Sequence, residues 1–233
     1  MMIMTGLTAI SPDTTAHRAL VLLEQAGWHR IATGDWSWVL IDRTGACAAR
    51  VTPFDPAYRM YAEACLNGRP VRWLPHVTSI IPLRREGYIV VMERLWPANP
   101  SAASTFCAAL GIPCDSGYVV DSRQPFDWAD DADLTNVRAL VLRLIAEGAH
   151  RFKLWGGSDI RPANVMVDGR GQLKLVDPIF LRGQAIVEAL RGGRRDLLTD
   201  FCRGQLEDFL TIPFFAADGV SDEPRRHLAF LYE

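Results

Sequence analysis

The feature that most constrains this chain is a run of acidic and amide residues within residues 156–180. Asp159 stands in a loop after a helical segment, Asn164 follows five residues later, just before a short strand, and Asp177 ends the strand that returns. The residues at 168–171, Asp-Gly-Arg-Gly, are typical of a tight hairpin turn. Because such a hairpin brings its outer ends together, we expect Asn164 and Asp177 to face the same point, with Asp159 beside them.

This set of oxygen-bearing side chains is what the transfer of a phosphoryl group from a nucleoside triphosphate needs. Mg²⁺ prefers carboxylate and amide oxygens, which Asp177 and Asn164 offer. A further carboxylate, Asp159, would orient an acceptor hydroxyl and take its proton. Arg161 lies two residues past Asp159 and would stabilise charge on the transferred group. A lone loop aspartate is more often a turn or cap residue, so the interpretation depends on all three positions together.

The first half of the chain reads as a small sheet with helices. We expect a helix that begins at Ser11 and ends near Gly27, three strands within residues 28–53, and a helix over 55–66. Two more strands follow at 77–83 and 88–92. Five strands and an intervening helix predict an antiparallel sheet in an α+β fold.

The second half has a different character. A stretch rich in Pro, Ser and Ala around residue 97 predicts a boundary, with an N-lobe over 1–96 and a reduced, mostly helical C-lobe over 97–233. Apolar periodicity predicts helices over 101–110 and 134–148, and a mostly helical tail from 184 to 232. The two lobes together would form one domain.

Composition excludes several classes of protein. The formal net charge is −2, which argues against a nucleic-acid partner. No apolar run has the length of a membrane span, and the first residues lack the basic start of a signal peptide. The five cysteines are scattered without a metal-binding spacing, so we expect reduced thiols. These observations predict a cytoplasmic protein with no membrane partner, and they leave its oligomeric state open.

The run D-I-R-P-A-N at 159–164, followed by V-D-P at 176–178, resembles the catalytic loop and the metal-binding loop of the protein-kinase-like superfamily. The resemblance implies a two-lobed kinase-like fold that uses ATP and Mg²⁺, with Mn²⁺ as a possible substitute. It also implies that Asp159 is the catalytic base, assisted by Arg161, and that Asn164 and Asp177 are the metal ligands.

The N-terminal half resembles the nucleotide-binding lobe of the same superfamily. Residues 31–51 look like a degenerate glycine-rich loop and the strand after it, which implies that Gly34 and Ser37 contact phosphate. Arg50 stands where that strand normally carries a lysine, and Glu63 is the corresponding acid on the helix. Residues 88–95 look like the last strand and the hinge, where the residues that would bind the nucleotide are Met92, Glu93 and Leu95.

The sequence also departs from the family pattern. Arginine at position 50 keeps the charge of lysine but has a different reach and hydration. Gly157 and Ser158 replace the usual His-Arg pair before the catalytic acid, and Pro178-Ile179 replace Phe-Gly. The missing arginine normally anchors a phosphorylated activation loop, so we do not expect that form of regulation.

Within the superfamily, the segments at 22–40 and 57–75 are similar to the early serine/threonine kinases of T-odd podophages, and the chain is also similar to minimal bacterial effector kinases. This resemblance implies an ATP-dependent kinase of phage or effector origin that phosphorylates serine or threonine of host proteins in the host cytoplasm. Three alternatives stay open: a small-molecule phosphotransferase of the aminoglycoside type, with an acidic pocket at 127–133; a pseudokinase that only binds; and a kinase fold that transfers AMP.

Overall fold

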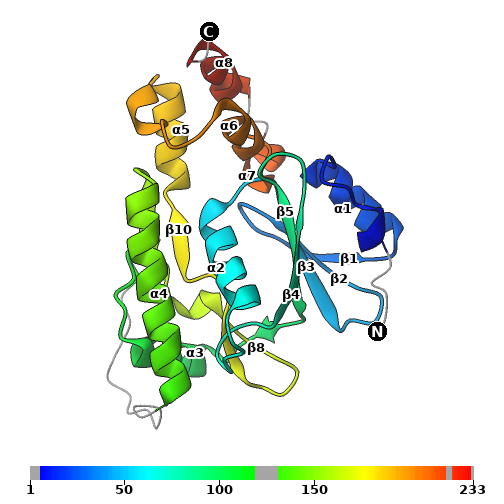
Figure 1. Ribbon diagram of the computed structural model, residues 1–233, viewed down its shortest axis with the longest axis vertical. Helices are drawn as coiled ribbons and strands as arrows, with labels where there is room; N and C mark the ends of the chain where they lie inside the picture. The colour runs from blue at the N-terminus through cyan, green and yellow to red at the C-terminus, as the bar shows by residue number, and fades with distance from the viewer. Residues whose placement is uncertain (1–5, 119–130, 219–221, 232–233) are drawn as a thin grey trace. The chain divides into compact units, whose positions relative to one another are not determined.

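A computed structural model of the protein describes residues 6–118, 131–218 and 222–231 (Figure 1). The chain forms two compact units. Unit 1 consists of Met1–Pro56, Val77–Met92 and Gly183–Glu233, and unit 2 consists of Ala57–His76 and Glu93–Arg182. Each unit combines antiparallel strand pairs with helices, which confirms the predicted α+β class.

Unit 1 contains a five-stranded sheet in the order β1-β2-β3-β5-β4. Its antiparallel pairs are β1 with β2, β2 with β3, and β4 with β5. The three strands expected before residue 53 and the two expected after residue 76 are therefore confirmed. Their bounds are β1 His29–Thr33, β2 Trp38–Ile41, β3 Cys47–Thr52, β4 Val77–Pro82 and β5 Tyr88–Glu93.

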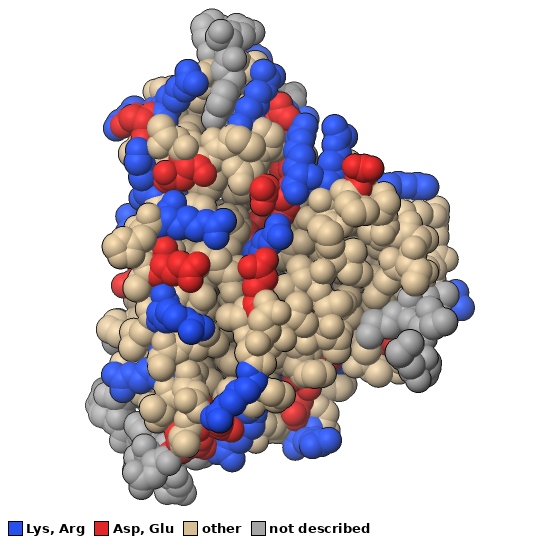
Figure 2. Space-filling model, viewed as in Figure 1, with Lys and Arg blue, Asp and Glu red and all other residues tan. Residues whose placement is uncertain are grey.

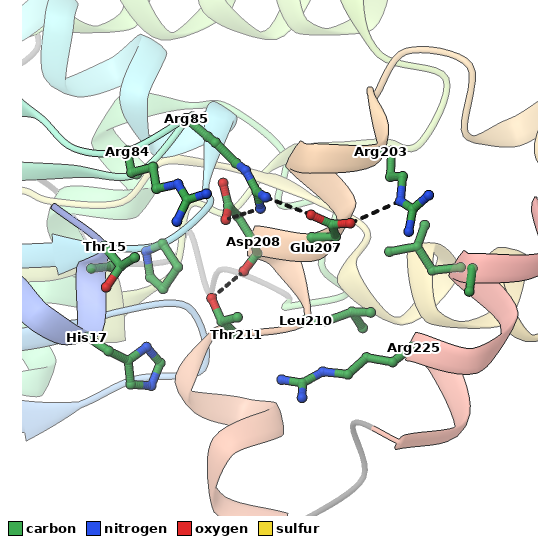
Figure 3. A pocket seen from close by; sticks show the side chains of 15 residues that line it. Thr15, His17, Arg84, Arg85, Arg203, Glu207, Asp208, Leu210, Thr211 and Arg225 are labelled. Carbon is green, nitrogen blue, oxygen red and sulfur yellow. Dashed lines mark hydrogen bonds and ion pairs between the residues drawn. The ribbon is translucent and has the colours of Figure 1, made fainter. Parts of the chain in front are cut away.

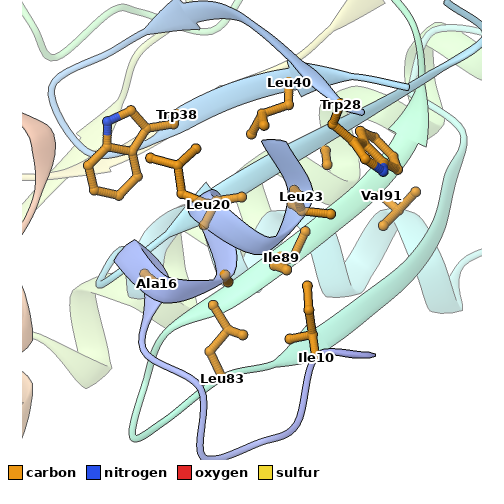
Figure 4. Packing of buried hydrophobic residues seen from close by; sticks show 13 residues of the cluster. Ile10, Ala16, Leu20, Leu23, Trp28, Trp38, Leu40, Leu83, Ile89 and Val91 are labelled. Atoms are coloured by element: carbon orange, nitrogen blue, oxygen red, sulfur yellow. The ribbon is translucent and has the colours of Figure 1, made fainter. Parts of the chain in front are cut away.

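Helix α1, Ala16–Gln25, covers the apolar face of this sheet (Figure 4). Leu20 and Leu23 of the helix pack among buried strand residues, and this burial drives the helix onto the sheet. The helix begins later than expected, because the side chain of Thr15, not that of Ser11, caps it by accepting a hydrogen bond from the Arg18 amide. It ends at Gln25, near Gly27 as expected, and the φ of 90° at Gly27 suits glycine. The buried strand residues of the cluster are Trp38, Leu40, Ala49, Val51, Ile89 and Val91.

The C-terminal helices belong to unit 1, together with the sheet. They are α5 Gly183–Arg191, α6 Arg203–Phe209, α7 Pro213–Asp218 and α8 Asp222–Leu231. Phe54, which follows β3, has its ring centroid 5.7 Å from that of Phe201 and 5.9 Å from that of Phe209. This aromatic packing explains why the tail and the sheet form one compact unit. The division into lobes at residue 96 stays a prediction.

Unit 2 is built on three helices: α2 Pro56–Asn67, α3 Pro100–Leu110 and α4 Ala132–Arg151. Two small sheets accompany them: β6 Trp96–Pro97 with β8 Val165–Val167 and β9 Leu173–Leu175, and β7 Trp155–Ser158 with β10 Ile179–Leu181. Helix α2 belongs to this unit apart from its first residue. The buried Tyr61 of α2 accounts for this, since its hydroxyl donates to the Leu175 carbonyl.

The surface carries charges of both signs. On the face that Figure 2 shows, basic and acidic side chains are interspersed. None of the helices described in the three ranges above is both long and apolar enough to cross a membrane. All five cysteines are free thiols, as expected.

Candidate active site

The hairpin of β8 and β9 brings the predicted metal ligands together. Val165 pairs with Leu175 in its antiparallel register, so the residues just outside that pair, Asn164 and Val176, are also adjacent. The Val176 amide donates to the Asn164 carbonyl at 2.9 Å, which extends the ladder by one step. Asp177 follows directly, and it therefore lies next to Asn164 as the hairpin predicted.

The side-chain amide of Asn164 joins the three predicted residues. Its Nδ2 atom lies 2.7 Å from Oδ2 of Asp159, 2.8 Å from the Asp159 carbonyl and 2.8 Å from the Asp177 carbonyl. Two N–H bonds are shared among these three acceptors, so the amide group is fixed in orientation. Asn164 is only 9% exposed, and its amide oxygen points away from the nitrogen that makes these contacts.

Asp159 is held from both sides of its carboxylate. Oδ2 accepts from Asn164 and lies 3.1 Å from Nε of Arg161, which places Arg161 at the site as expected. Oδ1 accepts a 2.5 Å hydrogen bond from the hydroxyl of Ser116. The Asp159 amide donates to the Pro178 carbonyl at 2.7 Å, which ties the catalytic segment to the residue after Asp177.

The donor set fits a hard divalent cation. Asn164 offers an amide oxygen and Asp177 a carboxylate, and Mg²⁺ typically takes one or two such protein ligands and fills its remaining positions with water and phosphate oxygens. Among the described residues, no group of three or more His, Cys, Asp or Glu side chains could hold a metal ion.

Tyr61 lies close to this hairpin within unit 2. Burial raises the pKa of its hydroxyl well above the usual range, and the nearby charges, that of Asp177 among them, act in the same direction. The phenol therefore stays protonated and continues to donate to the Leu175 carbonyl, two residues before Asp177. This contact supports the position of the strand that carries the metal-ligand candidate.

In unit 1, Arg50 projects from β3 and pairs with an acid. Its Nη2 atom lies 3.2 Å from Oδ2 of Asp55, and the two side chains are only 14% and 11% exposed. Glu63, the expected acid on α2, forms a more exposed pair with Arg59 at 2.9 Å within unit 2. The role of Arg50 at phosphate and that of Glu63 as its partner stay predictions.

The loop between β1 and β2 is tightly anchored within unit 1. The Gly34 amide donates to the Ser37 carbonyl at 2.9 Å, and the Ser37 side chain is buried. The Phe214 amide donates to the Asp35 carbonyl at 3.0 Å, and Trp36 has its ring centroid 5.4 Å from that of Phe209. The predicted phosphate contacts of Gly34 and Ser37 therefore lie in a loop with a fixed shape.

The predicted hinge residues lie at the point where the chain passes from unit 1 to unit 2. Met92 and Leu95 are buried within their own units. The side chain of Glu93 accepts from the His76 amide at 2.8 Å and lies 3.5 Å from Nζ of Lys174. Its own amide donates to the His76 carbonyl at 3.0 Å. Contacts of these residues with a nucleotide stay a prediction.

Sequence reasoning missed the 114–117 turn. Ser116 contacts Asp159, and Asp115 contacts Ser158, although 43 residues separate the two members of each pair. A Pro-Cys-Asp-Ser-Gly run at 113–117 indicates a turn, but no spacing rule links it to the catalytic loop. Of the acidic segment at 127–133, residues 127–130 lie outside the described residues. Asp131 caps α4 and pairs with Arg72.

Unit 1 also contains a separate cavity of about 490 Å³ (Figure 3). Arg85 crosses it to reach Glu207 at 2.8 Å and Asp208 at 3.2 Å. Burial raises the pKa of Asp208, although the neighbouring Arg85 opposes the effect. None of the predicted site residues lines this cavity, so it forms no part of the candidate active site.

Comparisons with known proteins gave structural matches only: no family model and no curated protein matches the chain. Aminoglycoside phosphotransferase APH(3'')-Id from Streptomyces rimosus is 11% identical, over 94% of this chain and 99% of that one, with a TM-score of 0.34. Aminoglycoside phosphotransferase APH(4)-Ia is 13% identical, over 91% and 95%, with a TM-score of 0.32. A thermostable mutant of it, in complex with AMP-PNP and hygromycin B, is 14% identical, over 91% and 87%, with a TM-score of 0.31.

At TM-scores of this size we draw no conclusion about the reaction from these structures. The likeness to podophage and effector kinases is not addressed by any of them and stays a prediction.

Proposed function

We propose that this protein is a phosphotransferase that moves the γ-phosphoryl group of ATP to an acceptor hydroxyl. The observation that carries the proposal is that the side-chain amide of Asn164 donates both to the carboxylate of Asp159 and to the backbone carbonyl of Asp177. A carboxylate positioned to accept a proton next to a pair of hard oxygen ligands is the arrangement that phosphoryl transfer requires.

Each side chain has a distinct task in this proposal. Asp159 orients the acceptor hydroxyl and takes its proton. Asn164 and Asp177 would hold Mg²⁺, which when bound neutralises charge on the phosphates. Arg161, 47% exposed and adjacent to Asp159, is available to the transferred group. For Arg50 we propose the role that the resemblance gives to lysine, a cation that contacts the phosphates of ATP.

For the acceptor we propose a serine or threonine hydroxyl of a protein. The bond between the Ser116 hydroxyl and Asp159 supports this choice, because it demonstrates that a seryl side chain fits against the proposed base. The alternative is a hydroxyl of a small molecule. The solved structures named above are aminoglycoside phosphotransferases, so this alternative is tested on equal terms.

The deciding experiment measures label transfer from γ-labelled ATP with Mg²⁺ to casein, to hygromycin B and to water. We expect transfer by the wild type and a loss of about 10²- to 10⁴-fold in Asp159→Asn, which removes the base. Asp177→Asn should be similarly impaired, with partial recovery at higher Mg²⁺, and Arg50→Lys should retain more transfer than Arg50→Ala.

The acceptors distinguish the alternatives. Label on casein supports a protein kinase, and label on hygromycin B supports a small-molecule phosphotransferase. If the wild type bound ATP but labelled neither the three acceptors nor its own chain, the protein would be a pseudokinase. Transfer of label from α-labelled ATP would instead identify AMP transfer.

A further inference from the structure

The 114–117 turn is docked onto the catalytic segment by a specific set of bonds. The Asp115 amide donates to the Ser158 carbonyl at 3.0 Å, and the Ser158 amide donates back to Oδ2 of Asp115 at 2.9 Å. Ser158 is fully buried, and its hydroxyl lies 3.1 Å from the same carboxylate oxygen. These reciprocal bonds fix the turn one residue away from Asp159.

Gly157 is necessary for this docking. Its φ is 100°, and a Cβ atom placed on it would lie 2.2 Å from Oδ2 of Asp115. Only glycine therefore lets the Asp115 carboxylate approach the backbone here. Gly157 and Ser158 stand where the family pattern that the sequence resembles has histidine and arginine. These two replacements together allow the 114–117 turn to dock.

The docked turn presents Ser116 to the proposed base. The Ser116 hydroxyl lies 2.5 Å from Oδ1 of Asp159, within the range of charge-assisted O–H···O⁻ bonds. The other carboxylate oxygen is engaged by Asn164 and Arg161. Ser116 therefore occupies the one oxygen of Asp159 on which an acceptor hydroxyl would be activated, and the residue is itself exposed.

We propose that Ser116 is an intramolecular phosphoacceptor. The inference rests on the proposed function. Oγ of Ser116 forms a bond to the γ-phosphorus of ATP while the bond from that phosphorus to the bridging oxygen breaks. The hydroxyl proton passes to the carboxylate of Asp159, and the products are phosphoserine and ADP.

The modification would also change access to the base. A phosphoserine carries a charge of about −1.5 to −2, and at position 116 this charge would stand beside the carboxylates of Asp159 and Asp115. Like charges at this distance repel, so the modified turn leaves Asp159. The first phosphorylation therefore frees Oδ1 for an external acceptor.

The test is phosphopeptide mapping of the full chain after incubation with γ-labelled ATP and Mg²⁺. We expect phosphate on Ser116 in the wild type, with a rate constant that does not depend on protein concentration. Ser116→Ala and Asp159→Asn should lose the modification at 116. Ser101→Ala, which removes another exposed hydroxyl of unit 2, should keep it in full. Ser116→Ala should label casein or hydrolyse ATP at least as fast as the unphosphorylated wild type.

Three outcomes would overturn the inference. If the wild type transferred phosphate to casein, hygromycin B or water while Ser116 stayed unmodified, Ser116 would not be an acceptor, and the proposed function would stand. If labelling at 116 rose in proportion to protein concentration, the reaction would be intermolecular. If no transfer or ATP hydrolysis occurred at all, the proposed function would fail and this inference with it.

Discussion

At the scale of single residues, Asn164 is the side chain that connects Asp159 with Asp177. Its Nδ2 atom is a donor among three oxygen acceptors, one of them a carboxylate oxygen. An oxygen atom in place of Nδ2 would have no hydrogen to donate and would be repelled by these three oxygens. The amide of Asn164 therefore affects the stability of the fold, in addition to its proposed role in binding a cation.

We expect Asn164→Asp to lower the free energy of unfolding at pH 7 by about 1–3 kcal/mol, because it replaces buried hydrogen bonds with repulsion from Asp159. We expect repulsion from Asp159 to raise the folded-state pKa of the new carboxyl. Its destabilising charge is then lost as the pH falls, and the deficit should shrink between pH 7 and pH 4. Urea unfolding at the two pH values measures both effects.

Asn99→Asp is the matched control for this substitution. Asn99 caps α3 by accepting from the amides of Ser101 and Ala102, and aspartate accepts equally well at such a position. This variant should unfold like the wild type. Equal stability of Asn164→Asp and Asn99→Asp would contradict the assigned orientation of the Asn164 amide.

Cys107 gives a second prediction at this scale. Its side chain is 1% exposed, and burial raises the pKa of the thiol from 9.0 to about 12, with nearby Cys114 acting in the same direction. An acid with a raised folded-state pKa contributes full stability below the unfolded-state pKa and loses it as the pH rises. Between pH 8 and pH 10 this thiol should therefore reduce the free energy of unfolding by about 1.4 kcal/mol.

Urea unfolding of Cys107→Ala measures this contribution. The variant should be less stable than the wild type at both pH values. However, its free energy of unfolding should fall less between pH 8 and pH 10 than that of the wild type does, and the difference should equal the contribution of the thiol. Cys202→Ala, at an exposed thiol, should keep the wild-type difference. A Cys107→Ala slope equal to that of the wild type would show that the thiol ionises normally in the folded chain.

At the scale of elements, the hairpin and the turn show what sequence can and cannot predict. Asn164 and Asp177 are separated by a short hairpin whose turn residues are explicit, so their contact followed from local rules. The contact of Ser116 with Asp159 depends on how a distant loop packs against Gly157. Nothing in the spacing of residues encodes that packing.

The β1–β2 loop provides a prediction about an element. Trp36 at its tip stacks near Phe54 and Phe209, and a Cβ on Gly183 would lie 2.7 Å from its ring. Trp36→Ala should therefore lower the free energy of unfolding by about 2–3 kcal/mol, measured by urea denaturation. Trp96→Ala, in the short strand β6 and 38% exposed, should cost less than half as much. Equal costs for the two would mean that the loop is not anchored by its tryptophan.

At the scale of the whole molecule, the five strands and most helices could be predicted, and the division into lobes at residue 96 stays a prediction. Strand and helix patterns are local, whereas the membership of a compact unit depends on contacts between distant segments. Phe54 and Phe209 are far apart in the sequence, and no sequence pattern predicts that their rings pack together. The division at residue 96 followed composition, and composition does not record such contacts.

This grouping predicts the result of truncation after Arg182. If the tail formed part of a separate helical lobe, its removal would leave the N-terminal sheet intact. Because α5–α8 instead belong to unit 1, the truncation exposes Phe54 and Trp36 and removes the acids that pair with Arg85. Exposed aromatic surface of this kind destabilises a fold and promotes aggregation.

We expect hydrogen exchange of the β5 amides at Ile89 and Val91 to lose most of its protection in the truncated chain. Phe209→Ala in the full chain should lower that protection in the same direction but to a smaller extent, because it removes one ring of the cluster and keeps the helices. Phe214→Ala, at an exposed ring of α7, is the matched control and should change it little. A truncated chain with wild-type protection in β5 would show that the sheet is stable without its C-terminal helices, and the division at residue 96 would then describe the folding units better.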